Sequence, residues 1–286
     1  MSTELAQLVY EQKAGNFLSV AFANYKLLLV LIDDDAYRYL LRDLLEVYKT
    51  FEEEYELHLG HISNPKDCQC ACLREPWIGE ALKAAWAPTL KRAGRLESDV
   101  VHFFKKKDYR TVQVSKEVRE HEMAVREISV KNPEYLVIFP FVMYSETTKG
   151  ENLVRSFLFR TLFGCTAAYP FDGPQKDSTK GAAFFEYNMN LAQVQAERQS
   201  LITKLNSIKV PQQVVPTLVS QAKALAERNL AVKHSARYWT VSLVIFSAKA
   251  IFYTIILIMF TIPLWVPRYW HWMEKNGYHN HDHSEL

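Results

Sequence analysis

Apolar side chains recur at helical spacing in the segment 33–58. Three aspartates come first, and the apolar positions then recur every three or four residues, at Tyr37, Leu40, Leu41, Leu44, Tyr48, Phe51 and Tyr55. An aspartate suits the start of a helix, because its carboxylate accepts hydrogen bonds from the free backbone N–H groups and offsets the positive end of the helix dipole. The spacing predicts an amphipathic helix with one buried face.

Three further stretches predict helices. Residues 79–104 have helical periodicity, which Pro88 is expected to break. Residues 190–208 place one set of side chains on a single face: Leu191, Val194, Arg198, Leu201, Leu205 and Ile208. Residues 216–232 begin with a proline that is compatible with a first helical turn. Strand signals are few, so the pattern predicts an all-α domain.

The segment 135–144 is ambiguous, because it combines β-branched and aromatic residues with Pro140. Its continuation, residues 153–162, has apolar side chains at helical spacing. We interpret both halves as one long helix that is kinked at the polar stretch "SETTKGEN", residues 145–152. Such a break is either a surface turn or a place where the helix opens to bring its backbone close to a ligand.

The strongest apolar run lies near the C-terminus. Residues 250–266 carry no charge, and at 1.5 Å per residue they rise about 26 Å, close to the thickness of a thin hydrocarbon core. Aromatic side chains typical of membrane interfaces flank the run: Tyr238, Trp239, Trp265, Tyr269, Trp270 and Trp272. We predict a transmembrane anchor at 238–266, although a buried core helix remains an alternative.

This anchor divides the chain. Residues 1–235 contain no linker or repeat and are predicted to form one domain, and residues 267–286 form a polar tail with His279, His281 and His283. The N-terminus does not resemble a signal peptide. We therefore expect a tail-anchored protein whose helical domain faces the cytosol.

Composition excludes some functions. The formal net charge of the 286-residue chain is +2, which gives no electrostatic argument for a nucleic-acid partner. Cys68, Cys70 and Cys72 lie close together, and their spacing could bind a soft metal with His58 or His61 nearby. However, the C-x-C-x-C spacing is not that of common zinc sites. The alternative is a reduced loop, and we predict no metal site here.

The order of these segments resembles that of the haem oxygenases. Four segments carry the resemblance, in the expected order and followed by an anchor: "YLLRDLLEVYKTFEEEYE" (39–56), "WAPTLKRAGRLESDVVHFF" (86–104), "GAAFFEYNMNLAQVQAERQSLITKLNSI" (181–208) and "LVSQAKALAERNLAV" (218–232). The resemblance implies a single helical haem-oxygenase-like domain with haem as substrate and cofactor. It further implies degradation to biliverdin, carbon monoxide and iron, electrons from NADPH–cytochrome P450 reductase, and anchoring in the endoplasmic reticulum membrane.

The resemblance also implies site residues. Tyr144 and Gly150 match positions of the kinked distal helix that contacts haem, and Arg198 matches a basic residue near the propionates. Thr147 stands where the family has its catalytic aspartate, and an ungapped count places Gly15 where the family has its iron-ligating histidine.

These substitutions leave two hypotheses open. One is a divergent haem oxygenase, in which Tyr10 is an alternative oxygen ligand for iron. The other is a non-catalytic relative that binds haem, another hydrophobic ligand or a partner protein. The sequence does not decide whether the protein is an enzyme.

Overall fold

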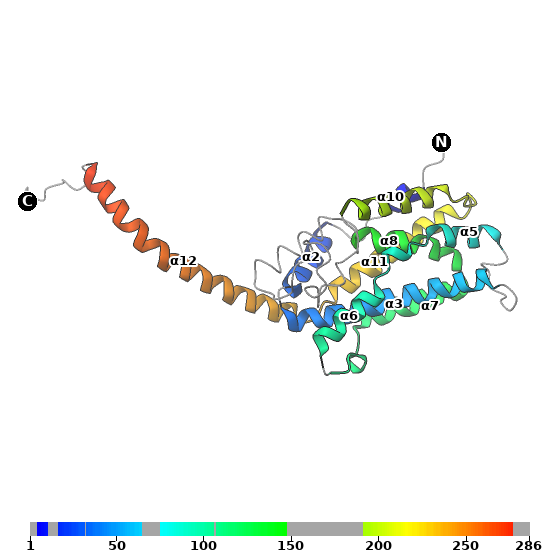
Figure 1. Ribbon diagram of the computed structural model, residues 1–286, viewed down its shortest axis with the longest axis horizontal. Coiled ribbons are helices and arrows are strands. Elements are labelled where there is room, and N and C mark those ends of the chain that lie inside the picture. The colour runs from blue at the N-terminus through cyan, green and yellow to red at the C-terminus, as the bar shows by residue number, and fades with distance from the viewer. Residues whose placement is uncertain are drawn as a thin grey trace, which may run out of the picture. The chain divides into compact units, whose positions relative to one another are not determined.

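The computed structural model describes residues 5–10, 17–31, 33–64, 75–105, 107–147 and 191–276 (Figure 1). Within these ranges all regular structure is helical, which confirms the predicted all-α class. The α-helices are α1 (Leu5–Tyr10), α2 (Phe17–Leu31), α3 (Asp34–Ser63), α5 (Pro76–Ala85), α6 (Ala93–Phe104), α7 (Lys116–Lys131), α8 (Phe139–Thr147), α10 (Leu191–Ser207), α11 (Val215–His234) and α12 (Trp239–Lys275). Short 3₁₀ helices are η2 (Pro88–Leu90), η3 (Tyr109–Thr111) and η4 (Pro133–Ile138).

Helix α3 forms the centre of the domain and begins as its sequence predicts. The Asp33 side chain accepts hydrogen bonds from the backbone N–H groups of Asp35 and Ala36, at 3.0 and 3.4 Å. All residues of the predicted apolar stripe are buried except Leu44, which is partly buried against the same core. This face packs mainly against α6 and α7. One amphipathic helix therefore organises much of the core.

The predicted break at Pro88 is present. Helix α5 ends at Ala85, the 3₁₀ turn η2 begins at Pro88, and α6 begins at Ala93. Helix α11 carries Pro216 in its first turn, where the missing N–H of proline costs no helical hydrogen bond.

The ambiguous segment 135–144 differs from the single long helix that we predicted. Residues 133–138 form the 3₁₀ helix η4, and the α-helix begins only at Phe139, with Pro140 in its first turn. A proline fits this position because the first turn of a helix does not use its N–H group. The remainder of the proposed kink, 148–152, and its continuation lie outside the described residues.

A partly buried ion pair, between a buried aspartate and a half-buried arginine, ties the C-terminal end of the domain to its centre. The Asp43 carboxylate on α3 accepts hydrogen bonds from the Arg237 guanidinium at 3.0 Å and from the Ser115 backbone N–H at 3.2 Å. Arg237 also donates to the Gln113 carbonyl oxygen at 2.6 Å. Three segments far apart in the sequence therefore meet at one carboxylate.

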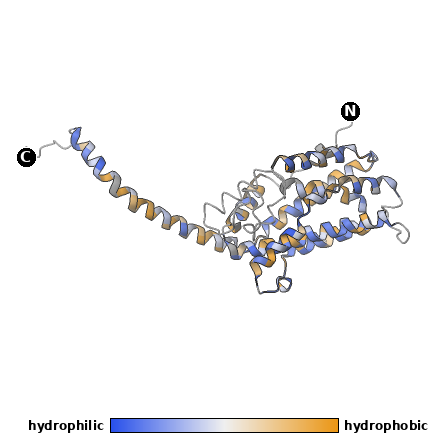
Figure 2. Cartoon of the chain, in the orientation of Figure 1, coloured by the Kyte–Doolittle hydropathy of each residue, from blue (hydrophilic) through white to orange (hydrophobic). Residues whose placement is uncertain are grey.

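The chain divides into two compact units, Met1–Trp239 and Thr240–Leu286. In the second unit, none of the residues in the most apolar window of α12 is buried, and Figure 2 colours much of this helix as hydrophobic. A core helix of a soluble protein would bury these side chains. Helix α12 is therefore a candidate membrane span, and the predicted boundaries at residues 235 and 266 stay predictions.

Candidate functional site

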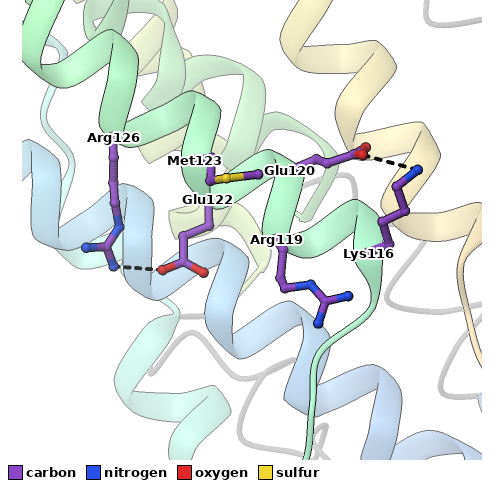
Figure 3. Close-up of a pocket in the computed structure, with 6 residues that line it drawn as sticks. All are labelled: Lys116, Arg119, Glu120, Glu122, Met123 and Arg126. Atoms are coloured by element: carbon purple, nitrogen blue, oxygen red, sulfur yellow. Dashed lines mark hydrogen bonds and ion pairs between the residues drawn. The ribbon is translucent and has the colours of Figure 1, made fainter.

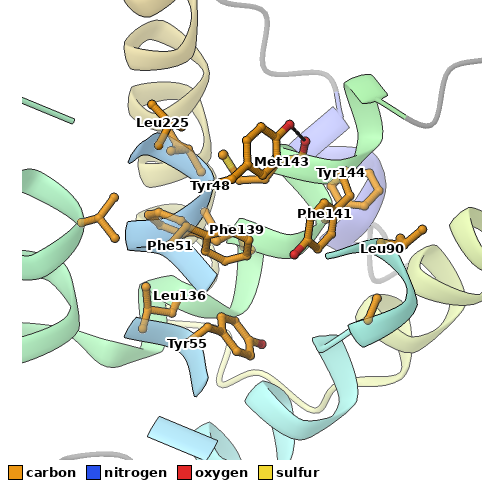
Figure 4. Close-up of a cluster of buried hydrophobic side chains, with 14 of the residues drawn as sticks. Tyr48, Phe51, Tyr55, Leu90, Leu136, Phe139, Phe141, Met143, Tyr144 and Leu225 are labelled. Carbon is orange, nitrogen blue, oxygen red and sulfur yellow. Dashed lines mark hydrogen bonds between the residues drawn. The ribbon is translucent and has the colours of Figure 1, made fainter. Parts of the chain in front are cut away.

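Aromatic rings from three segments pack together beside α8, and we call this group the aromatic wall. Its members are Tyr48, Phe51 and Tyr55 of α3, Trp86, and Phe139 and Tyr144 of α8. Phe51 stacks on Phe139 at a centroid distance of 5.8 Å, and its edge meets Tyr144 at 5.7 Å (Figure 4). Tyr55 stacks on Trp86 at 4.6 Å. Such ring pairs add stabilisation beyond the burial of their area.

A buried carboxylate lies at the edge of the aromatic wall. Glu52 accepts hydrogen bonds from the backbone N–H groups of Arg92, at 2.6 Å, and Ala93, at 3.2 Å. Both groups lie at the start of α6, whose own N-cap residue makes no side-chain cap bond. Glu52 therefore caps α6 from α3. Burial raises the pKa of Glu52, and the two N–H groups act in the opposite direction.

The Tyr144 hydroxyl donates the third hydrogen bond to Glu52, at 3.0 Å. Tyr144 is fully buried, and burial together with the neighbouring Glu52 carboxylate raises the pKa of its phenol far above the usual range. The phenol therefore stays protonated and acts as a donor. Sequence resemblance assigned Tyr144 to haem contact, which stays a prediction, whereas the structure places its hydroxyl in the core network.

A buried polar atom with no hydrogen-bond partner among the described residues lies on α11, next to Met143 of α8. The Tyr48 hydroxyl donates to the Met143 carbonyl oxygen at 3.1 Å, and Asn229 of α11 donates from Nδ2 to the Met143 sulfur at 3.5 Å. The Asn229 side-chain oxygen is buried, and no group in the described ranges donates to it. A buried acceptor without a donor costs free energy, so this atom suits a bound water or a polar group of a ligand.

The helices that carry the predicted site residues are neighbours. Helix α1 packs against α8, α10 and α11, and α10 also packs against α8. Arg198 lies on α10, half-buried, and its Nε is buried with no acceptor in the described part of the chain. Thr147 is the last residue of α8, and Tyr10 ends α1. Gly15 and Gly150 lie outside the described residues.

The donor set does not fit the histidine-ligated haem that the family resemblance implies. The sequence has no histidine before His58. His58 bonds to Ser129 at 2.9 Å, and His234 bonds to Ser19 at 2.9 Å. Of the residues in α1, only Tyr10 has a side chain of a type that ligates haem iron. By the resemblance, Thr147 would stand where the family has its distal aspartate, and a threonine has no carboxylate.

Sequence reasoning missed Glu52 and Asn229. A signal for Glu52 exists, because in "FEEEYE" only the first glutamate falls four residues after Tyr48 and three before Tyr55, on the buried stripe. Asn229 carries no comparable signal of its own. Cys68, Cys70, Cys72 and the histidines of the tail lie outside the described residues, and the described ranges contain no cluster of three or more metal-ligating side chains.

A surface pocket on α7 is not part of this site. It is lined by charged side chains and one methionine of that single helix: Lys116, Arg119, Glu120, Glu122, Met123 and Arg126 (Figure 3). Arg126 pairs with Glu122 at 2.8 Å and Lys116 with Glu120 at 3.4 Å, so most of the charges are already balanced. Exposed pairs at this spacing are ordinary features of a solvated helix.

Comparison with known proteins identifies the fold. No protein-family model matches the sequence, and no curated protein is detectably similar to it. Among solved structures, heme oxygenase-1 from a Synechocystis species in complex with heme matches with a TM-score of 0.62 and 19% identity, over 87% of this chain and 100% of that chain. Heme oxygenase-2 from the same genus, in complex with heme and NO, gives 0.61 and 19%, over 81% of this chain and 84% of that chain.

A third structure, heme oxygenase from Leptospira interrogans, gives a TM-score of 0.60 at 19% identity, over 81% of this chain and 98% of that chain. These matches confirm the predicted haem-oxygenase-like fold. At this level of identity the likeness concerns the fold, and activity has to be argued from the residues.

Proposed function

We propose that the helical domain binds haem, and that α12 holds it at a membrane. The observation that carries the haem proposal is the extent of the fold match, which covers 100% and 84% of two heme oxygenase structures in complex with heme. The buried Asn229 oxygen without a donor and the partly buried Arg198 are consistent with a ligand beside α8 and α10. Binding without turnover is the function that the residues support best.

Haem degradation to biliverdin, carbon monoxide and iron is the second candidate, and the same fold favours it. It would require electrons from a partner such as NADPH–cytochrome P450 reductase. Against it, this chain presents neither an imidazole at position 15 nor a carboxylate at position 147. Proton delivery in such a site depends on a positioned acid or base, and a threonine hydroxyl is a poor substitute. We therefore derive no catalytic step.

Gly15→His is expected to give the haem iron an imidazole ligand that the unchanged protein lacks. Titration of the full-length protein in detergent with haem should give saturable binding and an absorption spectrum without imidazole ligation. The variant should show an imidazole-ligated spectrum and bind about tenfold or more tightly, equivalent to about 1.4 kcal/mol, because it adds an axial bond. Gly15→Ala is the matched control and should behave as the unchanged protein.

Failure of the unchanged protein to bind haem saturably would contradict the haem proposal. If Gly15→His and Gly15→Ala gave the same spectrum, position 15 would not face the iron.

Turnover is measured on the same samples with NADPH and cytochrome P450 reductase. The unchanged protein should form no biliverdin, whereas Gly15→His combined with Thr147→Asp should form it, since the pair restores both missing groups. Biliverdin from the unchanged protein would make haem degradation the correct function.

Membrane anchoring is tested by truncation. The full-length protein should stay with membranes after an alkaline carbonate wash, and a chain that ends at Trp239 should be found in the soluble fraction, because it lacks the apolar helix. Release of the full-length protein by the wash would contradict the anchor. Imaging of the tagged full-length protein tests the further proposal that the membrane is the endoplasmic reticulum and that the domain faces the cytosol.

A further inference from the structure

Helix α2 has two faces of different kinds. One face is seated on the domain, where Ala23 and Val30 are fully buried. The other face is exposed and apolar, and we call it the α2 apolar face: Phe17, Leu18, Ala21, Phe22 and Tyr25. At 100° per residue these five side chains lie within an arc of about 140°. Phe17 and Leu18 are 84% and 74% exposed, and they adjoin further exposed apolar side chains instead of being scattered singly over the surface.

The α2 apolar face lies next to the point where the membrane helix begins. The Phe22 ring meets the edge of the Trp239 ring at a centroid distance of 5.7 Å, and Trp239 is the first residue of α12. Tyr238, half-exposed, packs against Tyr39 at 5.0 Å. Tryptophan and tyrosine concentrate at the level of lipid headgroups, because their rings are apolar and their N–H or O–H groups are polar.

The length of α12 agrees with this placement. Residues 239–266 rise about 42 Å at 1.5 Å per residue, which is close to the 40–45 Å thickness of a bilayer with its headgroups. In the proposed placement, the bilayer with its headgroups extends from near Trp239 to near Val266. Phe22 contacts Trp239 directly, so the α2 apolar face begins one ring contact away from the residue where the proposed span starts.

The charge of α2 suits a lipid surface. Its sequence contains no acidic residue, and Lys26 is its only charged side chain. The Lys26 ammonium lies 4.8 Å from the centre of the Phe22 ring and 5.1 Å from that of Trp239, and it donates a hydrogen bond to the His234 carbonyl oxygen at 3.0 Å. Lys26 is thus half-buried and held against the domain, and the exposed face itself carries no charge that insertion into lipid would have to bury.

We propose that the α2 apolar face inserts into the headgroup region of the membrane that α12 crosses, as a second contact between the protein and lipid. This inference rests on the proposed anchoring by α12. A lipid surface is the occupant because the face continues from the residue where the span starts. A second copy of the chain is the alternative occupant. It would have to cover the α2 apolar face while both copies are held in the membrane by α12.

Photo-crosslinking in a bilayer tests the inference with the full-length protein. A benzophenone-bearing amino acid replaces Leu18, and the protein is reconstituted into phosphatidylcholine vesicles and irradiated. Mass spectrometry then measures lipid adducts. Two matched positions are controls: Val130 on α7, which is apolar and 81% exposed, and Ile258 within α12. We expect lipid adducts at positions 18 and 258, at several times the yield found at position 130.

The adduct yields at the three positions distinguish failure of the α2 contact from failure of the α12 anchor. Adducts at 258 but not at 18 would overturn the α2 contact and leave the anchor intact. No adducts at 258 would overturn the anchoring itself, and the α2 contact with it. Adducts from position 18 to a second copy of the chain, rather than to lipid, would show that the face is a protein interface and would overturn the inference.

Discussion

Glu52→Ala is expected to lower the free energy of unfolding by about 4 kcal/mol, since each buried donor left without its acceptor costs roughly 1–3 kcal/mol. The substitution deprives three donors at once: the N–H groups of Arg92 and Ala93 and the hydroxyl of Tyr144. It also removes the cap of α6, which no local side chain replaces. Urea unfolding of the full-length protein in detergent micelles, followed by helical circular dichroism, measures the loss.

Three comparison variants make this result specific. Glu52→Gln keeps one acceptor oxygen and should cost less than the alanine variant, and Tyr144→Phe removes one hydrogen bond and should cost about 1 kcal/mol. Glu53→Ala is the matched control, because Glu53 is exposed and only approaches Lys49 at 3.8 Å, so it should change stability by less than about 0.5 kcal/mol. Equal losses for the alanine variants at positions 52 and 53 would contradict the buried network.

The second large effect concerns pH and His121. This histidine is buried on α7, and neither ring nitrogen has a hydrogen-bond partner in the described part of the protein. Burial, together with the positive charge of Arg228 on α11, lowers the pKa of His121 from 6.5 to about 4. The unfolded chain therefore binds more protons than the folded chain between pH 6.5 and 4. Stability is lost as the pH falls through this window, by up to about 3 kcal/mol.

The measurement compares unfolding at pH 7 and pH 4.5 for the unchanged protein and for His121→Leu. The variant should lose less stability on acidification, because it has no imidazole to protonate. Burial raises the pKa values of Asp43 and Glu52, and this effect increases stability as the pH falls. The decisive quantity is therefore the difference in pH dependence between the unchanged protein and His121→Leu. His102→Leu alters an exposed histidine and should keep the full pH dependence. Identical pH profiles for the unchanged protein and His121→Leu would contradict the prediction.

The elements predicted correctly from the sequence are those specified by nearby residues. The start of α3 follows from Asp33, and its buried face follows from an uninterrupted stripe. The break between α5 and α6 follows from Pro88, which cannot continue a helix. In contrast, the pattern did not reveal α2 or α7. Helix α2 is apolar on nearly all sides and has no clear periodicity, and α7 places a histidine at a core position between Val118 and Val125.

The candidate site was only partly predictable, for a related reason. Family resemblance suggested Tyr144 and Arg198 as single positions, but the bonding of Tyr144 depends on partners that are distant in sequence. Glu52 is 40 residues from Arg92 and 92 from Tyr144. A local pattern can place Glu52 on the buried side of a helix, yet it cannot name the donors that meet it there. Those contacts arise from the packing of α3 against α6 and α8.

The pairing of Asp43 with Arg237 determines where a soluble fragment should end. A fragment cut after Ser235, just before the predicted anchor, would lack Arg237 and leave a buried aspartate without its cation. Removing one partner of a buried ion pair leaves an uncompensated charge, which destabilises the fold. A cut after Trp239 keeps the ion pair and the ring that contacts Phe22, and it still removes the apolar helix. The fold of the domain thus extends to the first residue of α12.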